Sequence, residues 1–168
     1  MVSIRHETAS DREAVFRVET AAFGKDAEAR LVDLLRDNGH CLLSLVAEDG
    51  AEVVGHIMFS PMTIEGDGAP WSAVCLAPVA VAPPRQNEGI GGLLIQAGLG
   101  ELRAAGHGAV ILLGHPTYYP RFGFRPAREF GLHYQDDRDA FMALELRPGV
   151  LEDVSGNVKF SPEFDEFE

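Results

Sequence analysis

The stretch that most constrains this chain runs from Leu76 to Leu94 and reads LAPVAVAPPRQNEGIGGLL. An apolar segment ends at Pro83-Pro84, a polar tetrad follows, and three glycines then lead into an apolar helical pattern. The first N–H groups of a helix lack partners and carry a partial positive charge, and glycines let a phosphate approach them. We therefore predict a pyrophosphate site on backbone N–H groups from Asn87 to Gly92. Alternatively, the glycines only allow the start of the helix to pack closely against its neighbours.

Length and composition indicate an ordinary globular protein. The 168 residues fit one domain, with 46% hydrophobic and 24% charged residues. No apolar run approaches the roughly 20 residues of a membrane span, and Met1 to Glu7 shows no apolar signal segment. Cys41 and Cys75 lie in apolar contexts without the spacing of metal ligands. We expect a cytoplasmic protein with reduced thiols, no metal and no membrane contact.

The formal net charge of −12 bears on the partners. Nucleic-acid affinity rests on Lys and Arg at phosphates, and the chain has no basic run. We therefore expect no nucleic-acid partner. The charge favours a cationic or neutral substrate, although solubility alone also explains it.

Hydrophobic periodicity predicts the elements of the first half of the chain. Val2 to Arg5 alternates like a strand, and Ser10 to Glu13 matches a capping box. Apolar spacing predicts two helices, one that ends near Gly24 and one from Asp26 to Asn38-Gly39. The strands that follow are listed in chain order: 41–47, 52–60 with a continuation through 62–64, and 71–81. Pro78 places the last of them at an edge, or marks where it parts from a neighbour.

The second half begins with a helix after the glycines that ends at Gly106. Ala109 to Leu113 reads as a strand buried on both faces, and 118–122 as one helical turn. The ranges 124–130 and 140–146 read as strands, with a polar turn at 136–139. A run of antiparallel strands followed by a β-α-β unit predicts a fold of the general α/β class, and within it the α+β type. We expect a mixed sheet with helices on both faces.

Two familiar phosphate-binding motifs fail on spacing. A dinucleotide fingerprint would need a third glycine where Leu94 stands, and a Walker A loop would need Lys and Ser or Thr where Leu93 stands.

A third motif fits. Gln86 to Gly91 resembles the Q/R-x-x-G-x-G/A signature of the GNAT superfamily of N-acetyltransferases, after an apolar strand and at a helix start. The segment 118–124, YYPRFGF, is similar to the closing F-Y-x-x-x-G-F of that family. The resemblance reaches roughly to Leu146 and is strongest for YhbS-like bacterial members. In one departure, 112–115 lacks the asparagine that many members carry at the end of the fifth strand, so one contact to cofactor or substrate is missing or replaced.

The resemblance implies a fold and an activity. It implies a mostly antiparallel sheet with splayed fourth and fifth strands, and transfer of an acetyl group from acetyl-CoA to a primary amine by direct attack. It implies a small-molecule or peptidyl acceptor and is compatible with a homodimer. The residues expected to bind acetyl-CoA are Val79, Ala80, Val81, Arg85, Gln86, Asn87, Glu88, Gly89, Ile90, Gly91 and Gly92.

Catalytic candidates are fewer. Tyr119 resembles the family tyrosine that protonates the leaving thiolate, and packing is its alternative role. His115 is a candidate base, or a polar loop residue. His56 is a candidate base or a core histidine, and the acids Glu65 and Asp67 border the acceptor or lie in a solvated turn. Arg121 and Arg125, like Arg85, are phosphate contacts or surface charges.

Two readings of function stay open at this stage. One is the N-acetyltransferase, formed by a single domain at 1–150 with an acidic tail, 151–168, that packs on it or extends from it. The alternative is a non-catalytic acyl-CoA-binding regulatory module, which would share the phosphate site and differ at Tyr119.

Overall fold

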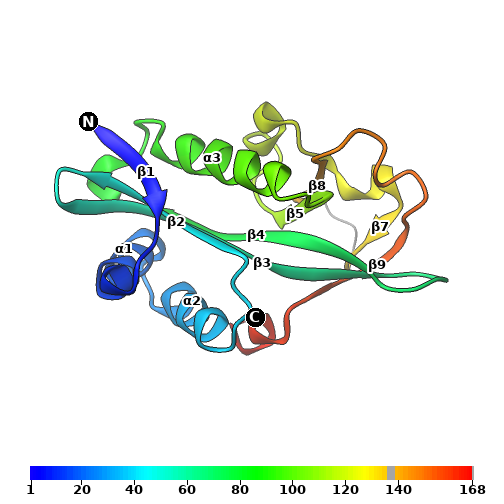
Figure 1. Cartoon of the computed structure of the whole chain (residues 1–168), viewed down its shortest axis with the longest axis horizontal. Helices are drawn as coiled ribbons and strands as arrows, with labels where there is room; N and C mark the ends of the chain where they lie inside the picture. The colour runs from blue at the N-terminus through cyan, green and yellow to red at the C-terminus, as the bar shows by residue number, and fades with distance from the viewer. Residues whose placement is uncertain (136–138, 168) are drawn as a thin grey trace. The chain divides into compact units, whose positions relative to one another are not determined.

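The computed structural model describes residues 1–135 and 139–167 and divides into two compact units (Figure 1). The first unit comprises Met1–Ser60, Ala77–Gly100 and Pro162–Glu168, and the second comprises Pro61–Leu76 and Glu101–Ser161. The predicted turn at 136–139 falls largely outside the described residues.

The first unit begins with strand β1 (Val2–His6), the 3-10 turn η1 (Ala9–Asp11) and helices α1 (Arg12–Phe23) and α2 (Ala27–Asp37). The predicted capping box at Ser10 is wrong by two residues. Thr8 is the N-cap, and Asp11 accepts the Thr8 N–H at 2.7 Å, so the reciprocal bonds precede α1. The helix ends are as predicted, because Gly24 takes a left-handed conformation (φ 72°) and Asp26 occupies the N-cap of α2.

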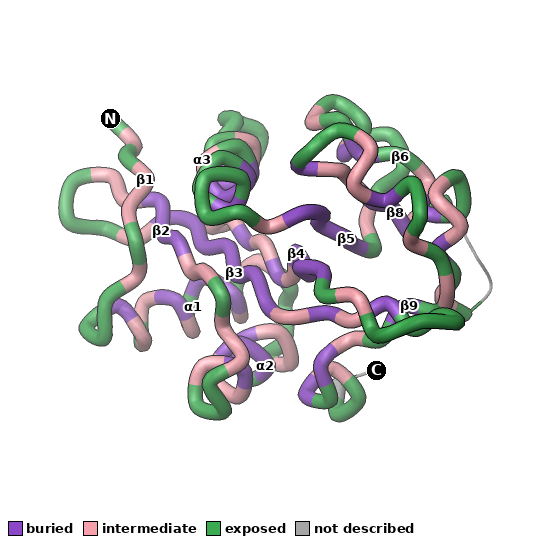
Figure 2. Tube along the Cα trace, turned by 45° about the vertical axis from the view of Figure 1, so that its right-hand side comes forward, coloured by how far each residue is buried: buried purple, intermediate pink, exposed green. Residues whose placement is uncertain are grey.

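Strands β2 (Leu43–Asp49) and β3 (Glu52–Glu65) form an antiparallel hairpin, and β1 pairs with β2 in the same sense. The predicted continuation of β3 through 62–64 is confirmed, and β3 is buried over most of its length (Figure 2). Side chains alternate across the hairpin, so one face of β3 carries His56 and Met58 and the other carries Phe59. Helices α1 and α2 cover the first face and α3 (Ile90–Ala104) covers the second (Figure 1).

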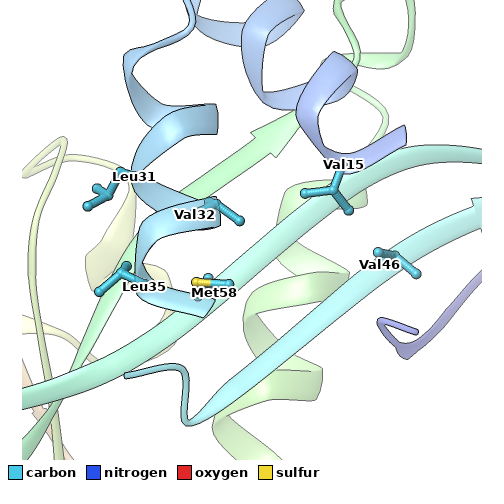
Figure 3. Packing of buried hydrophobic residues seen from close by; sticks show 6 residues of the cluster. All are labelled: Val15, Leu31, Val32, Leu35, Val46 and Met58. Atoms are coloured by element: carbon cyan, nitrogen blue, oxygen red, sulfur yellow. The ribbon is translucent and has the colours of Figure 1, made fainter. Parts of the chain in front are cut away.

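The core under α1 and α2 is a cluster of aliphatic side chains (Figure 3). Its buried members are Val15, Leu31, Val32, Leu35, Val46 and Met58. The C-terminal turn η5 (Pro162–Phe167) also contacts α2, where Phe164 packs against this cluster. Oε2 of Glu163 lies 2.8 Å from Nδ2 of Asn38 and 2.6 Å from Nδ1 of His40.

The second unit contains the first half of β4 (Trp71–Val81), then β5 (Ala109–Leu113), β8 (Phe141–Glu145) and β6 (Arg125–Pro126), hydrogen-bonded in that order. The β4–β5 pair is parallel, whereas β5–β8 and β6–β8 are antiparallel. Ala109 to Leu112 is buried, as expected for a strand covered on both faces. The mixed, mostly antiparallel sheet is confirmed.

Two parts of the second unit differ from expectation. The predicted strand at 124–130 is limited to β6, because the chain then forms the 3-10 turn η4 (Ala127–Phe130), and Pro126 cannot donate a hydrogen bond to extend a ladder. The segment after Gly149 supplies a strand that periodicity missed, β9 (Gly156–Phe160). β9 pairs antiparallel with the end of β3 and parallel with β7 (Leu132–His133).

The ladder between β4 and β5 covers two residue pairs, Val74↔Val110 and Cys75↔Ile111. It ends before Pro78, whose peptide bond with Ala77 is cis. Beyond this point β4 belongs to the first unit and β5 to the second. The splaying of the two strands stays a prediction.

Candidate functional site

The glycine-rich stretch forms an exposed turn between β4 and α3. The 3-10 turn η2 (Pro83–Arg85) stops the strand, and α3 begins at Ile90. Two residues of the turn take left-handed conformations, Asn87 (φ 67°) and Gly89 (φ 85°). We call Gln86–Gly92 the donor turn.

The main-chain N–H groups of the donor turn are available to a ligand. The N–H of Gln86 bonds to the carbonyl of Pro83 at 3.3 Å, and the N–H of Leu93 bonds to that of Gly89 at 3.1 Å. Between them, within the described residues, the N–H groups from Asn87 to Gly92 have no hydrogen-bond acceptor. An ideal Cβ on Gly89 would meet nothing within 4 Å, so the space above the turn is open. A run of free donors at a helix N-terminus fits a diphosphate.

Side chains of the turn fix its shape rather than cover it. The Gln86 side-chain amide donates to the carbonyl of Val81 at 3.0 Å, which ties the turn to the end of β4. Arg85 is held by two acids, with Nη1 3.0 Å from Asp49 and Nε 3.1 Å from Glu88. The Glu88 contact, and then the Asp49 contact, raise the pKa of Arg85. Two carboxylates therefore already neutralise part of the positive charge that Arg85 could offer to a ligand phosphate.

The end of β4 leads into the donor turn. Val79 and Val81 are half-buried and Ala80 is buried. The N–H of Ala82 donates to the carbonyl of Val54 at 2.9 Å, so this end of β4 lies beside the start of β3. A role for the backbone of Val79–Val81 in binding pantetheine stays a prediction.

Close packing holds α3, and with it the donor turn, against β3. A Cβ placed on Gly98 would overlap the ring of Phe59, so the helix approaches the strand as closely as the missing side chain allows. Ile90 and Leu94 are buried on the same helix face. The helix start is therefore fixed by the core of the first unit.

Tyr119 belongs to the second unit, in the 3-10 turn η3 (Tyr119–Phe122). Its side chain is buried and meets the rings of Tyr118 and Phe124 edge-on, with centroids 5.2 and 5.8 Å away. Burial, and to a smaller extent Tyr118, raises the pKa of Tyr119 to about 12. The phenol therefore stays protonated at neutral pH.

Gly114 determines where the Tyr119 ring lies. A Cβ at this position would overlap that ring, and Gly114 directly follows β5. Sequence reasoning treated Gly114 only as a strand end. The sequence did offer one signal, because Gly114 stands directly before His115, a candidate base.

The remaining predicted residues are exposed or engaged with neighbours. His115 is exposed, and its carbonyl accepts the N–H of Tyr118 at 3.1 Å. Asp67 lies in an exposed turn, and Glu65 pairs with Lys159 at 3.2 Å. Arg121 covers the ring of Tyr118 at 4.3 Å, and Arg125 pairs with Glu129 at 2.6 Å.

Sequence reasoning missed a buried polar network in the first unit. His56 and Glu19 are both fully buried, and Nδ1 of His56 lies 2.7 Å from Oε2 of Glu19. Nε2 of His56 lies 2.8 Å from Oγ of Ser44, which donates to Glu7, and Oε2 of Glu7 lies 2.6 Å from Arg36. We call Glu7, Glu19, Arg36, Ser44 and His56 the buried polar network. His56 is thus a satisfied core histidine.

The pKa values of the network follow from burial and charge. Burial alone would lower the pKa of His56, but the contacts with Glu19 and Glu7 raise it above its ordinary value. Burial raises the pKa of Glu19. Burial would also raise the pKa of Glu7, but His56, Ser44 and Arg36 lower it. A charged His56 beside the two carboxylates accounts for the raised pKa of His56 and the lowered pKa of Glu7, whereas at Glu19 the effect of burial exceeds that of His56.

A cavity of about 460 Å³ opens beside the network. Its lining includes Glu7, Thr8, Arg36, Cys41, Leu43 and Ser44. Glu7 is engaged with two other lining residues, Ser44 and Arg36, and burial raises the pKa of the Cys41 thiol.

Within residues 1–135 and 139–167, no helix is long and apolar enough to cross a membrane. The same residues hold no cluster of three or more His, Cys, Asp or Glu side chains placed to bind a metal ion.

Known proteins resemble this chain over most of its length. A family model described as an acetyltransferase (GNAT) domain matches residues 3–127. A relative from Escherichia coli K12, with the name "Uncharacterized N-acetyltransferase YhbS", is 35% identical over 167 residues, which is 98% of this chain and 99% of the relative. A second, "Uncharacterized N-acetyltransferase YjhQ" from the same strain, is 45% identical over 119 residues, or 70% of this chain and 66% of the relative.

Solved structures give the same result. The crystal structure of the Escherichia coli GNAT family N-acetyltransferase YhbS in complex with CoA has a TM-score of 0.92 and 34% identity, covering 99% of this chain and 93% of that one. A GNAT family acetyltransferase from Brucella melitensis in complex with acetyl-CoA has a TM-score of 0.82 and 38% identity, covering 98% and 99%.

Proposed function

This chain belongs to the GNAT family of acetyltransferases, and we propose that it transfers the acetyl group of acetyl-CoA to a primary amine of a small molecule or peptide. The observation that carries the proposal is the run of free main-chain N–H groups from Asn87 to Gly92 at the start of α3. The complexes of similar proteins with CoA and acetyl-CoA support acetyl-CoA as the donor.

The donor turn would bind the pyrophosphate of acetyl-CoA. Six consecutive donors and the partial positive charge of the helix start compensate phosphate charge without a basic side chain. Glu88 adds a negative charge at this place, and its pairing with Arg85 offsets that charge. Binding would therefore depend on the turn's backbone conformation more than on any single side chain.

The transfer itself is a direct attack. The neutral amine nitrogen forms a bond to the acetyl carbon, the carbon–sulfur bond breaks, and CoA leaves as a thiolate. The nitrogen loses one proton as the amide forms, and this loss balances the proton that the thiolate takes up. Holding the two reactants together contributes a large part of the rate enhancement, roughly 7–11 kcal/mol in favourable cases. Tyr119 would donate a hydrogen bond or a proton to the thiolate. A pKa of about 12 keeps the phenol protonated but makes it a weak acid, so we expect a moderate contribution.

A thiol-release assay tests the proposal. We expect free CoA to appear from acetyl-CoA with at least one member of a panel of alkylamines, polyamines, amino sugars and peptides with free N-termini. Tyr119→Phe should lower kcat roughly tenfold or more while the Kd for acetyl-CoA stays the same. Tyr118→Phe, a change of the same kind in the neighbouring half-buried ring, is the control and should leave kcat nearly unchanged.

Two results would each contradict one part of the proposal. Tight binding of acetyl-CoA with no thiol released for any amine would favour the non-catalytic acyl-CoA-binding module. Equal kcat for the Tyr119→Phe and Tyr118→Phe variants would remove Tyr119 from the mechanism and leave the acetyl transfer itself in place.

A further inference from the structure

The first unit has a second cavity, of about 410 Å³, whose lining ends directly before the donor turn. One wall is a single face of α1, because Ala14, Arg17, Val18 and Ala21 follow the helical spacing i, i+3, i+4 and i+7. The other walls are the turn between β2 and β3 and the segment Ala82 to Pro84. The volume is within the range of small-ligand sites. We call this cavity the α1 cavity.

Hydrogen bonds hold the walls of the α1 cavity together. The N–H of Ala82 donates to the carbonyl of Val54 at 2.9 Å, which fixes the segment before the donor turn to β3. Arg5 bridges two lining acids, with Nη1 2.8 Å from Oδ2 of Asp11 and Nη2 3.0 Å from Oε2 of Glu48. The bonds from Arg5 lower the pKa of Asp11, so this carboxylate stays ionised and engaged. The cavity is therefore formed before any ligand binds.

Two charged side chains of the lining have no partner of their own. Within residues 1–135 and 139–167, neither the Arg17 guanidinium nor the Glu52 carboxylate forms an ion pair or a hydrogen bond. Both residues are exposed, as are Ala21 and Pro83, so the cavity opens to solvent. Arg17 lies on α1, and Glu52 lies at the start of β3. The cavity thus presents one free cation and one free anion from two different elements.

The free state of Arg17 is informative in so acidic a chain. The sequence has 26 Asp and Glu against 14 Lys and Arg. Six other arginines each pair with an acid: Arg5, Arg12, Arg36, Arg85, Arg125 and Arg128. Arg17 shares a cavity with three acids and pairs with none of them among the described residues. Its guanidinium is therefore available to an external carboxylate, which it can bind with two parallel N–H donors.

Apolar groups make up much of the remaining lining. Val18 is 7% exposed, and Ala14 and Val53 are half-buried. Pro83 and Pro84 add two rings that carry no N–H group. A ligand that joins Arg17 to Glu52 would bury an apolar body against these groups.

We propose that the α1 cavity binds a small zwitterion with an apolar body, of the class of free dipeptides, whose carboxylate pairs with Arg17 and whose ammonium group pairs with Glu52. A dipeptide suits the two charges better than a single amino acid, because Arg17 and Glu52 do not reach each other and one more residue separates the charged ends by roughly a further 3.5 Å. The ligand would lie against the segment Ala82 to Pro84. The site does not depend on the proposed acetyl transfer.

Calorimetric titration of the full chain with leucyl-alanine, in the absence of acetyl-CoA, tests the site. The free dipeptide should bind more tightly than N-acetyl-leucyl-alanine, which lacks the ammonium group, and than leucyl-alanine amide, which lacks the carboxylate. Each cap should weaken binding roughly three- to tenfold, the loss of one charge-assisted pair at a partly exposed place. Glycylglycine, with the same charges and no apolar side chain, should bind more weakly than leucyl-alanine.

Two variants assign the ends of the ligand. In Glu52→Gln, the N-acetyl cap should cost no further affinity, while the amide cap still does. In Arg17→Gln, the amide cap should cost nothing further, while the N-acetyl cap still does. The controls are Glu13→Gln, at an exposed position of α1 outside the cavity lining, and Arg147→Gln, at an exposed arginine of the second unit. Both controls should bind every dipeptide as the wild type does.

Several outcomes would overturn the site. They are no binding of leucyl-alanine, affinities that the caps leave unchanged, and equal losses in Arg17→Gln and Arg147→Gln, which would indicate attraction by net charge alone. Because the titration contains no acetyl-CoA, the two proposals fail separately. Dipeptide binding with the expected pattern, in a protein that releases no CoA with any amine, would keep this site and contradict the proposed function. Acetyl transfer without dipeptide binding would do the reverse.

Discussion

The donor turn and the buried polar network are both polar sites of the first unit, and they are built in opposite ways. The donor turn is seven consecutive residues, exposed from Gln86 to Gly89, with free N–H groups from Asn87 to Gly92. The buried polar network takes its five side chains from β2, β3, α1, α2 and the segment after β1, and most of its polar atoms are bonded to each other. The backbone of the donor turn is arranged to bind a ligand. The buried polar network stabilises the unit to which the donor turn belongs.

The largest effect is expected from His56→Leu. The change leaves Glu19 buried without its partner, so the free energy of unfolding at neutral pH should fall by about 3–5 kcal/mol. Urea unfolding measures it, and His115→Leu, at an exposed histidine, is the control. Equal stabilities of the two variants would mean that the network does not stabilise the fold.

Two glycine substitutions test whether acetyl-CoA binding depends on the backbone conformation of the donor turn. Gly89→Ala places a side chain at φ 85°, where the left-handed conformation costs about 1–2 kcal/mol, and should weaken acetyl-CoA binding roughly tenfold. Gly100→Ala, on the exposed side of α3, should leave binding unchanged and raise stability by about 0.5–1 kcal/mol. Calorimetric titration with acetyl-CoA compares them. Equal affinities would show that the conformation of Gly89 does not matter.

The contrast also explains what the sequence could predict. Gln86 to Gly92 is one local pattern, so its helix start and turn follow from spacing alone. Glu7, Glu19 and Ser44 are ordinary polar residues in separate segments, and only the pairing of β2 with β3 and the packing of α1 bring them to His56. The strand β9 was missed for a similar reason, since it pairs with the far end of β3 and has little periodicity of its own.

The network should give stability a pH dependence of known sign. Because the folded-state pKa of His56 is raised, its contribution is fully present below the unfolded pKa near 6.5 and is lost as pH rises through the folded-state value. The difference in unfolding free energy between wild type and His56→Gln should therefore decrease as the pH rises above the unfolded pKa of histidine. The decrease should be at most about 1.4 kcal/mol per pH unit. A difference that grows with pH would show that His56 is neutral in the folded protein.

The smallest effect is expected at the rim of the donor turn. Glu88→Gln removes a negative charge and releases Arg85 from one of its two acids. Acetyl-CoA should bind roughly two- to fivefold more tightly at low salt, and the gain should shrink as salt screens it. Weaker binding in this variant would mean that the Arg85–Glu88 pair shapes the turn.

A titration of ¹⁵N-labelled protein with acetyl-CoA, followed by amide NMR, tests the account most directly. We predict that the amide signals of Asn87, Glu88, Gly89, Ile90, Gly91 and Gly92 shift most, because their N–H groups gain phosphate acceptors, while those of Glu7, Ser44 and His56 shift little. Binding with the largest shifts in the buried polar network, and unchanged signals in the donor turn, would contradict it.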